Sequence, residues 1–136
     1  MIVPEDHVRQ VEKVSQNLFI CPPHASQITA LAALYAKEEL DQNVNVYKKN
    51  REILLEELPK AGFTTFSPPD GAFYIYVDIS KFSNDSLSFC KKVLDEAGVA
   101  ITPGLDFDQN RGSNTIRFSY ARSTEDITEG ATRIKE

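Results

Sequence analysis

The turn sequence Ser-Pro-Pro-Asp-Gly at residues 67–71 is the feature that most constrains what this chain can fold into. It stands between two short segments, residues 63–66 and 72–77, that have the pattern of strands. Proline and Asp-Gly are the residues that a chain reversal requires, so the pattern predicts a β-hairpin. A sheet built on this hairpin has to bury one face against other elements.

The residues before this turn predict three helices. Apolar residues recur at three- and four-residue steps over residues 8–19, and Pro22-Pro23 ends this amphipathic helix. A second helix begins at about residue 24, and because it is apolar on much of its circumference we expect it to be well buried. A third and longer helix runs from about 40 to 58 and ends at Pro59. Its expected inward stripe consists of Val44, Tyr47, Leu54, Leu55 and Leu58.

The residues after the turn alternate between helical and extended patterns. Ser83 or Asn84 is placed to cap a helix over 84–97, and Gly98 is placed to end it in a left-handed conformation. Short strands are expected at 99–102 and 115–120. A capping pair, Ser123 and Asp126, then begins a final helix. The apolar face expected for the helix at 84–97 consists of Leu87, Cys90, Leu94 and Ala97.

Together these elements predict an α+β fold, a two-layer sandwich that follows a helical segment. Its sheet is expected to be mostly antiparallel, with about four strands near 63–66, 72–77, 99–102 and 115–120. The helices near 40–58, 84–97 and 123–135 are expected to cover one face of that sheet, because amphipathic helices and half-apolar strands bury their apolar sides together.

Composition argues against several classes of function. The chain has 136 residues, 20 acidic and 15 basic, and its net charge of -5 disfavours binding to nucleic acid. Its longest apolar run, residues 28–36, is about half the length of a membrane span, and a secretion signal is not indicated. Cys21 and Cys90 have no metal-ligand spacing, so neither zinc nor a disulfide framework is indicated. We therefore expect a cytoplasmic protein without a nucleic-acid, membrane or metal partner.

Three motifs occur in a fixed order in the second half of the chain. They are Pro-Asp-Gly-Ala-Phe-Tyr at 69–74, Gly-Val-Ala-Ile-Thr-Pro-Gly-Leu-Asp-Phe at 98–107, and Ile-Arg-Phe-Ser-Tyr-Ala at 116–121. In this order they resemble the C-terminal region of the aspartate-aminotransferase-like enzymes, the fold-type I family that uses pyridoxal 5'-phosphate. The resemblance extends upstream through Pro22-Pro23 and residues 47–51, so it covers the whole chain.

The resemblance implies a role for Arg117. In the family, the arginine of this motif binds the α-carboxylate of the substrate, and a planar guanidinium suits that task because it donates two parallel hydrogen bonds. The plainer interpretation is that Arg117 is a surface arginine on an edge strand. One departure from the pattern lies nearby, since the family usually has Phe-Gly where this chain has Phe107-Asp108, followed by a polar loop at 108–114.

A second departure is the absence of the family's cofactor lysine. That lysine lies in a Ser-x-Ser-Lys segment followed by Gly-x-Arg, whereas Lys81 has only one preceding serine and no Gly-x-Arg after it. The resemblance thus implies that catalytic and cofactor-binding residues lie outside this chain. It identifies residues 1–37 as a helical remnant of the large cofactor-binding domain and residues 38–136 as the small C-terminal domain. The parent enzyme is expected to be a homodimer that transfers an amino group between an amino acid and a 2-oxo acid, and the isolated chain is expected to be inactive.

Two other interpretations of the sequence stay open. One is a free-standing α/β module that binds a small carboxylate through Arg117 without catalysis. Another is a helical interaction module that uses residues 5–36. The coding sequence upstream of Met1 distinguishes these two modules from a fragment of an enzyme, because only the enzyme would have a Ser-x-Ser-Lys segment followed by Gly-x-Arg there. The amino acid that serves as substrate is not identified, because side-chain specificity in the family depends largely on residues outside this segment.

Overall fold

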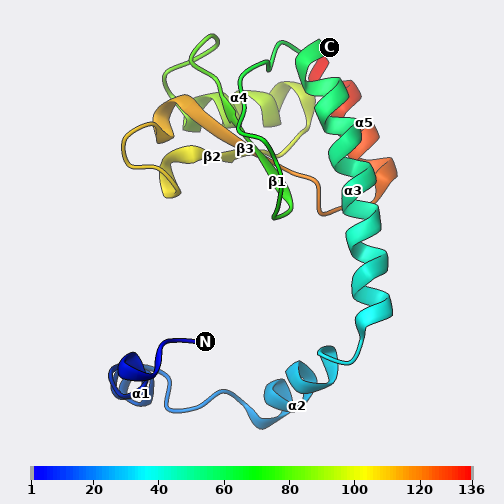
Figure 1. Cartoon of the computed structure of the whole chain (residues 1–136). Helices are drawn as coiled ribbons and strands as arrows, with labels where there is room; N and C mark the ends of the chain where they lie inside the picture. The colour runs from blue at the N-terminus through cyan, green and yellow to red at the C-terminus, as the bar shows by residue number, and fades with distance from the viewer. Residues whose placement is uncertain (1, 136) are drawn as a thin grey trace. The chain divides into compact units, whose positions relative to one another are not determined.

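A computed structural model describes residues 2–135. The chain divides between Leu40 and Asp41 into two compact units, which are described separately. The first unit contains helices α1 (Glu5–Leu18) and α2 (His24–Ala33) and the start of the long helix α3 (Lys37–Lys60), which begins after a short turn (Figure 1).

None of residues 2–40 is buried. The prediction that the helix beginning at residue 24 is well buried is therefore wrong, because nothing else in this small unit covers α2. Its sequence is that of a buried helix, and α1 is likewise amphipathic without a buried residue. The unit thus exposes a set of large apolar side chains, which we call the apolar surface of residues 2–40: Ile2, Val8, Val14, Leu18, Phe19, Ile20, Ile28, Leu31, Leu34, Tyr35 and Leu40.

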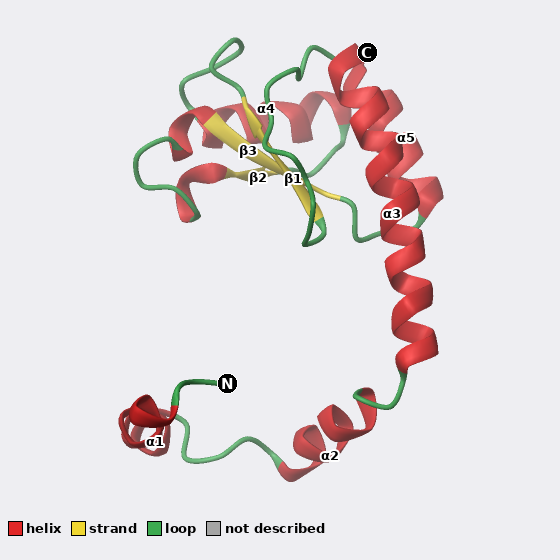
Figure 2. Cartoon of the chain, viewed as in Figure 1, coloured by secondary structure: helices red, strands yellow, loops and turns green. Residues whose placement is uncertain are grey.

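The second unit is built on a three-stranded antiparallel sheet (Figure 2). Strands β1 (Tyr74–Asp78), β2 (Thr102–Pro103) and β3 (Thr115–Ser119) have the spatial order β1-β3-β2, so β3 lies in the middle. The predicted strand at 63–66 is present only as an isolated antiparallel bridge between Phe66 and Val77. The hairpin is thereby reduced to a few backbone hydrogen bonds, such as that from the Ser67 N–H to the Tyr76 carbonyl. Pro68 and Pro69, which follow, have no N–H with which to extend the β-ladder.

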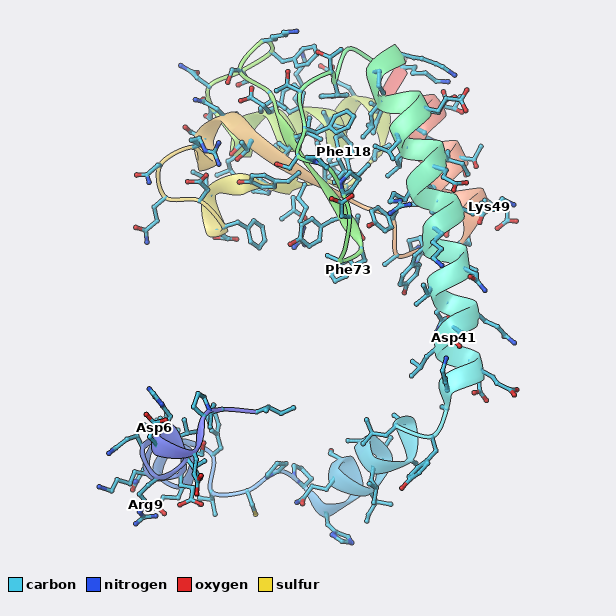
Figure 3. All side chains as sticks on the ribbon, in the orientation of Figure 1. Asp6, Arg9, Asp41, Lys49, Phe73 and Phe118 are labelled. Atoms are coloured by element: carbon cyan, nitrogen blue, oxygen red, sulfur yellow. The ribbon has the colours of Figure 1, made fainter. Side chains whose placement is uncertain are left out.

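Three helices cover one face of this sheet, as the sequence predicts. They are α3, α4 (Ser86–Ala97) and α5 (Thr124–Lys135). Side chains alternate along β1 and β3, so Ile75, Val77, Ile116 and Phe118 enter the core; Phe118 is labelled there in Figure 3. The helices contribute Leu54, Leu58, Cys90, Ile127 and Ala131. The α+β fold class is confirmed.

Several details of the helices differ from the prediction. The N-cap of α4 is Asp85, whose carboxylate accepts bonds from the backbone N–H groups of Leu87 and Ser88. The buried positions of α4 are Ser86 and Cys90, while Leu87 and Leu94 are exposed, so its inward stripe is rotated from the predicted one. Val44 of α3, predicted to face inward, is exposed as well. The left-handed C-cap at Gly98 and the Ser123 cap of α5 are confirmed.

A buried amide joins α3 to the chain between β3 and α5. Asn50 is fully buried, and its Nδ2 donates to the backbone carbonyls of Tyr120 (3.0 Å) and Arg122 (2.8 Å). Because an unpaired buried carbonyl is costly, these bonds fix where the chain leaves the sheet and begins α5. Lys135 of α5 also forms an ion pair with Glu57 of α3, and Figure 1 shows the two helices side by side.

The two cysteines are predicted to differ sharply in reactivity. Burial raises the pKa of the Cys90 thiol to about 11, so on the order of one molecule in a thousand carries a thiolate there at pH 8. Cys21 is exposed. Iodoacetamide at pH 8 should therefore label one thiol of the folded chain, at Cys21, and both thiols only after denaturant is added. Equal labelling rates at the two positions in the folded chain would contradict this.

Candidate functional site

The face of the sheet opposite the helices carries Arg117 on its middle strand. In the register, Arg117 lies opposite Tyr76 of β1 and opposite Thr102 of β2. Its neighbours along β3, Ile116 and Phe118, are buried among the helices, so the alternation of the strand directs Arg117 to the other face. Arg117 therefore belongs to the central strand, and the interpretation of it as a surface arginine on an edge strand is wrong.

Two aromatic rings cover the guanidinium of Arg117. The ring centroid of Phe107 lies 4.6 Å from its Cζ atom, and that of Tyr74 lies 5.0 Å away. Both distances are within the range of cation–π attraction. The rings limit hydration of the group, while its edge remains the part that can donate hydrogen bonds.

Arg117 differs from the other five arginines in having no polar partner among the described residues. Arg51 donates to the carbonyl of Pro69, and the remaining four each pair with a carboxylate: Arg9 with Glu12, Arg111 with Asp108, Arg122 with Asp126 and Arg133 with Glu129. The Nε atom of Arg117 is buried without a hydrogen-bond partner. A cation placed in this way is prepared for an anion that is supplied from outside the described chain.

A pocket of about 350 Å³ opens at this position. Its lining residues are Tyr74, Tyr76, Phe107, Asp108, Arg111 and Arg117. Of its two cations, Arg111 is already paired with Asp108, so Arg117 is the group that can receive a carboxylate. No lysine lines the pocket, so its residues fit a carboxylate and do not fit pyridoxal phosphate, which is held covalently by a lysine.

Two glycines allow the loop between β2 and β3 to pack against the sheet. The loop contains the short 3-10 helices η1 (Gly104–Asp106) and η2 (Gly112–Asn114). A Cβ on Gly104 would lie 2.1 Å from the Oγ1 of Thr115, and one on Gly112 would lie 2.7 Å from the carbonyl oxygen of Gly104. The Tyr76 hydroxyl and Thr115 Oγ1 are hydrogen-bonded at 2.6 Å directly beneath. This close approach brings Phe107 over Arg117.

A larger cavity lies elsewhere, on the helical side. Its volume is about 640 Å³, and aromatic rings of Phe63, Phe82 and Phe89 line part of it. Its arginine and its lysine are both partnered, Arg133 with Glu129 and Lys92 with Glu96. Because a binding site needs a few convergent polar groups as well as apolar surface, the smaller pocket at Arg117 is the better candidate.

Comparison with known proteins identifies the family to which this chain belongs. The family of aminotransferases of class I and II matches residues 1–134. The chain belongs to this family. A valine–pyruvate aminotransferase of Mycobacterium tuberculosis is 45% identical over 98% of the chain, and an aspartate aminotransferase of Sulfurisphaera tokodaii is 32% identical over all of it. A solved structure from Silicibacter pomeroyi is 60% identical and superposes with a TM-score of 0.89, covering 99% of this chain and 36% of that one.

The aminotransferase match is confined to part of each relative. The chain spans about 35% of the length of both curated relatives. The resemblance seen in the sequence is thereby confirmed, including its limitation to a segment of the family. Within residues 2–135, the structure has no helix long and apolar enough to cross a membrane.

Sequence reasoning missed three parts of this pocket. Tyr74 and Tyr76 carry a signal, because in a strand whose alternate residues are apolar they share the opposite face. Arg111 carries a weaker one, since it follows Asp108 by three residues in a polar loop. Their convergence on Arg117 depends on the strand register, which the local sequence does not encode.

Proposed function

We propose that this chain is the C-terminal part of an aminotransferase that transfers an amino group between an amino acid and a 2-oxo acid. Residues 1–37 would belong to the large cofactor-binding domain and residues 38–136 to the small domain. The observation that carries the proposal is Arg117, an arginine on the central strand with aromatic rings on its guanidinium and no polar partner among the described residues.

In this proposal Arg117 binds the α-carboxylate. The amino acid and the 2-oxo acid both carry that carboxylate, so a single arginine can orient both partners of the reaction. A charge-assisted pair with two parallel hydrogen bonds fixes direction as well as position. The stacked rings of Phe107 and Tyr74 support this role, because a partly dehydrated guanidinium attracts an anion more strongly than one in bulk water.

The cofactor would be held by the remainder of the protein. Pyridoxal phosphate supplies the electron sink that lets an amino group leave one carbon skeleton and join another. None of the nine lysines of this chain stands in the family's Ser-x-Ser-Lys context, and none lines the pocket at Arg117. The contribution of this chain is therefore to bind and orient the carboxylate.

The isolated chain is predicted not to retain pyridoxal phosphate and not to transfer amino groups. After incubation with the cofactor and gel filtration, its spectrum should lack a protein-bound band near the visible edge. A retained band that disappears when one particular lysine is replaced would show that a lysine of this chain binds the cofactor after all.

We also propose that the full-length enzyme is a cytoplasmic homodimer in which the apolar surface of residues 2–40 is covered. Exposed apolar surface of this extent is rare on a monomer in solution. The 136-residue chain alone should consequently self-associate, and sedimentation at increasing concentration should show species larger than a monomer. A strict monomer at high concentration, with residues 2–40 ordered, would count against this surface being an interface.

Reading the coding sequence upstream of Met1 tests the proposed function most cheaply. A Ser-x-Ser-Lys segment followed by Gly-x-Arg in the same reading frame would support an aminotransferase. A start codon at Met1 with nothing before it would instead favour a free-standing carboxylate-binding module. The substrate stays open, since the two relatives named above are described as acting with different amino acids, valine and aspartate.

A further inference from the structure

The aspartate that follows Phe107 has a structural task in this chain. The Asp108 Oδ1 atom accepts hydrogen bonds from the backbone N–H groups of Asn110 (2.9 Å) and Arg111 (3.0 Å). Its Oδ2 atom accepts a third bond from the Nε of Arg111, also at 3.0 Å. These bonds hold the pKa of the Asp108 carboxyl below its usual range, chiefly through the backbone N–H of Arg111.

These bonds close the loop directly behind Phe107. The backbone N–H groups of Phe107 and Asp108 both donate to the carbonyl of Gly104, and Gly112 donates to the carbonyl of Asp108. Ser86, fully buried at the start of α4, donates to the carbonyl of Gly112 at 2.7 Å. The loop is thus anchored at residues 104 and 112, and between these anchors the Asp108 carboxylate ties residues 108–111 together.

Phe107 itself is not held by the core. The residue is 53% exposed, and its ring lies over the guanidinium of Arg117. A half-exposed ring has several accessible rotamers, so its position over Arg117 depends on how firmly the loop is closed. Asp108 also lines the same pocket as Arg117. Because its carboxylate is paired with Arg111, it does not neutralise Arg117.

We propose that Asp108 and Arg111 are positioning residues for Arg117: their paired side chains close the loop so that Phe107 lies over the guanidinium and only its edge is open to a carboxylate. This inference rests on the proposed function for its consequence in catalysis.

The structural part is tested by NMR of the 136-residue chain, through the Nε–H signal of Arg117. Loss of one signal in Arg117→Lys assigns it. Aromatic rings over a guanidinium displace this signal by ring currents, so Phe107→Leu should move it towards the position of an unstacked arginine. Asp108→Ala should move it in the same direction, and Asp108→Asn should move it less, because an asparagine oxygen still accepts from the two backbone N–H groups.

The chain offers a matched control for these variants. Arg122 and Asp126 form an exposed pair with nearly the same geometry, 3.1 Å from Nε to Oδ2, on the surface at α5. Asp126→Ala should leave the Arg117 signal in place. If Phe107→Leu moves the signal and Asp108→Ala does not, the pair does not position Phe107. If neither moves it, the ring does not lie over Arg117 in solution, and the inference is wrong.

A kinetic measurement on the full-length protein separates this inference from the proposed function. Asp108→Ala should raise KM for the 2-oxo acid about two- to fivefold with little change in kcat, the size expected when one cation–π contact loosens. An unchanged KM, despite a displaced NMR signal, would overturn the catalytic consequence. If Arg117→Ala leaves turnover unchanged as well, the proposed function has failed, while the NMR result still decides the positioning.

Discussion

Replacing Arg117 by alanine in the full-length enzyme is expected to lower kcat/KM by about ten- to a few hundred-fold. A hydrogen bond to a charged group contributes about 1.5–3 kcal/mol, and each 1.4 kcal/mol corresponds to a factor of ten. Arg117→Lys should give an intermediate value, since lysine keeps the charge but loses the planar pair of donors. Steady-state kinetics with an amino acid and a 2-oxo acid, at saturating cofactor, measures both.

The same substitution should hardly change stability. Arg117 has no hydrogen bond or ion pair among the described residues, so its removal leaves no buried partner unpaired. Arg122→Ala is a suitable control, because it removes an arginine paired with Asp126 outside the pocket and should leave kcat/KM unchanged. A variant Arg117→Ala that unfolds at room temperature, yet turns over normally per folded molecule, would make Arg117 a structural anchor.

The largest effect on stability is expected from Gly104→Ala. The added Cβ would lie 2.1 Å from the Thr115 Oγ1, 2.7 Å from the Thr115 carbonyl oxygen and 2.7 Å from the Tyr76 hydroxyl. Two of these atoms belong to β3, the central strand, so the loop has to move away from the sheet. Overpacking of this kind typically costs about 1–3 kcal/mol, and each kcal/mol lowers Tm by roughly 4–8 °C in a domain of this size.

Gly71→Ala is the matched control, because a Cβ at Gly71 meets no atom within 4 Å. It should change the free energy of unfolding by well under ~1 kcal/mol, and a small gain is possible because alanine restricts the unfolded chain. Thermal unfolding followed by circular dichroism compares the two variants with the unmodified chain. Equal Tm values for the two variants would mean that the loop does not pack against Thr115 and Tyr76 as described.

Local patterns located the helices and strands β1 and β3, but not every boundary: α3 continues through Pro59 to Lys60, and β2 is Thr102–Pro103 instead of 99–102. The left-handed Gly98 and the Ser123 cap were predictable because a cap depends on residues within one turn. Leu87 and Leu94 show the limit of such patterns: both are apolar at helical spacing, yet both are exposed, because tertiary packing selects the stripe through Ser86 and Cys90. The strand predicted at 63–66 is reduced to one bridge, because Pro68 and Pro69 after it have no N–H with which to extend its pairing.

The pocket was predictable only in part. The motif that contains Arg117 identifies the residue through resemblance to a family, whereas the two rings around its guanidinium come from segments more than 30 residues apart in the sequence, at Tyr74 and Phe107. Their convergence depends on the pairing of β1 with β3 and on the close packing at Gly104. Neither the register nor that packing can be deduced from local sequence.

A crystal structure of the full-length protein with a bound 2-oxo acid tests the central claim most directly. We expect the two carboxylate oxygens to lie about 2.7–2.9 Å from the Nη atoms of Arg117, as in charge-assisted bidentate pairs. Phe107 and Tyr74 should remain on the guanidinium, near the 4.6 Å and 5.0 Å distances found here. A 2-oxo acid bound at another cation, with the Arg117 guanidinium paired to a protein carboxylate, would contradict the assignment of this pocket.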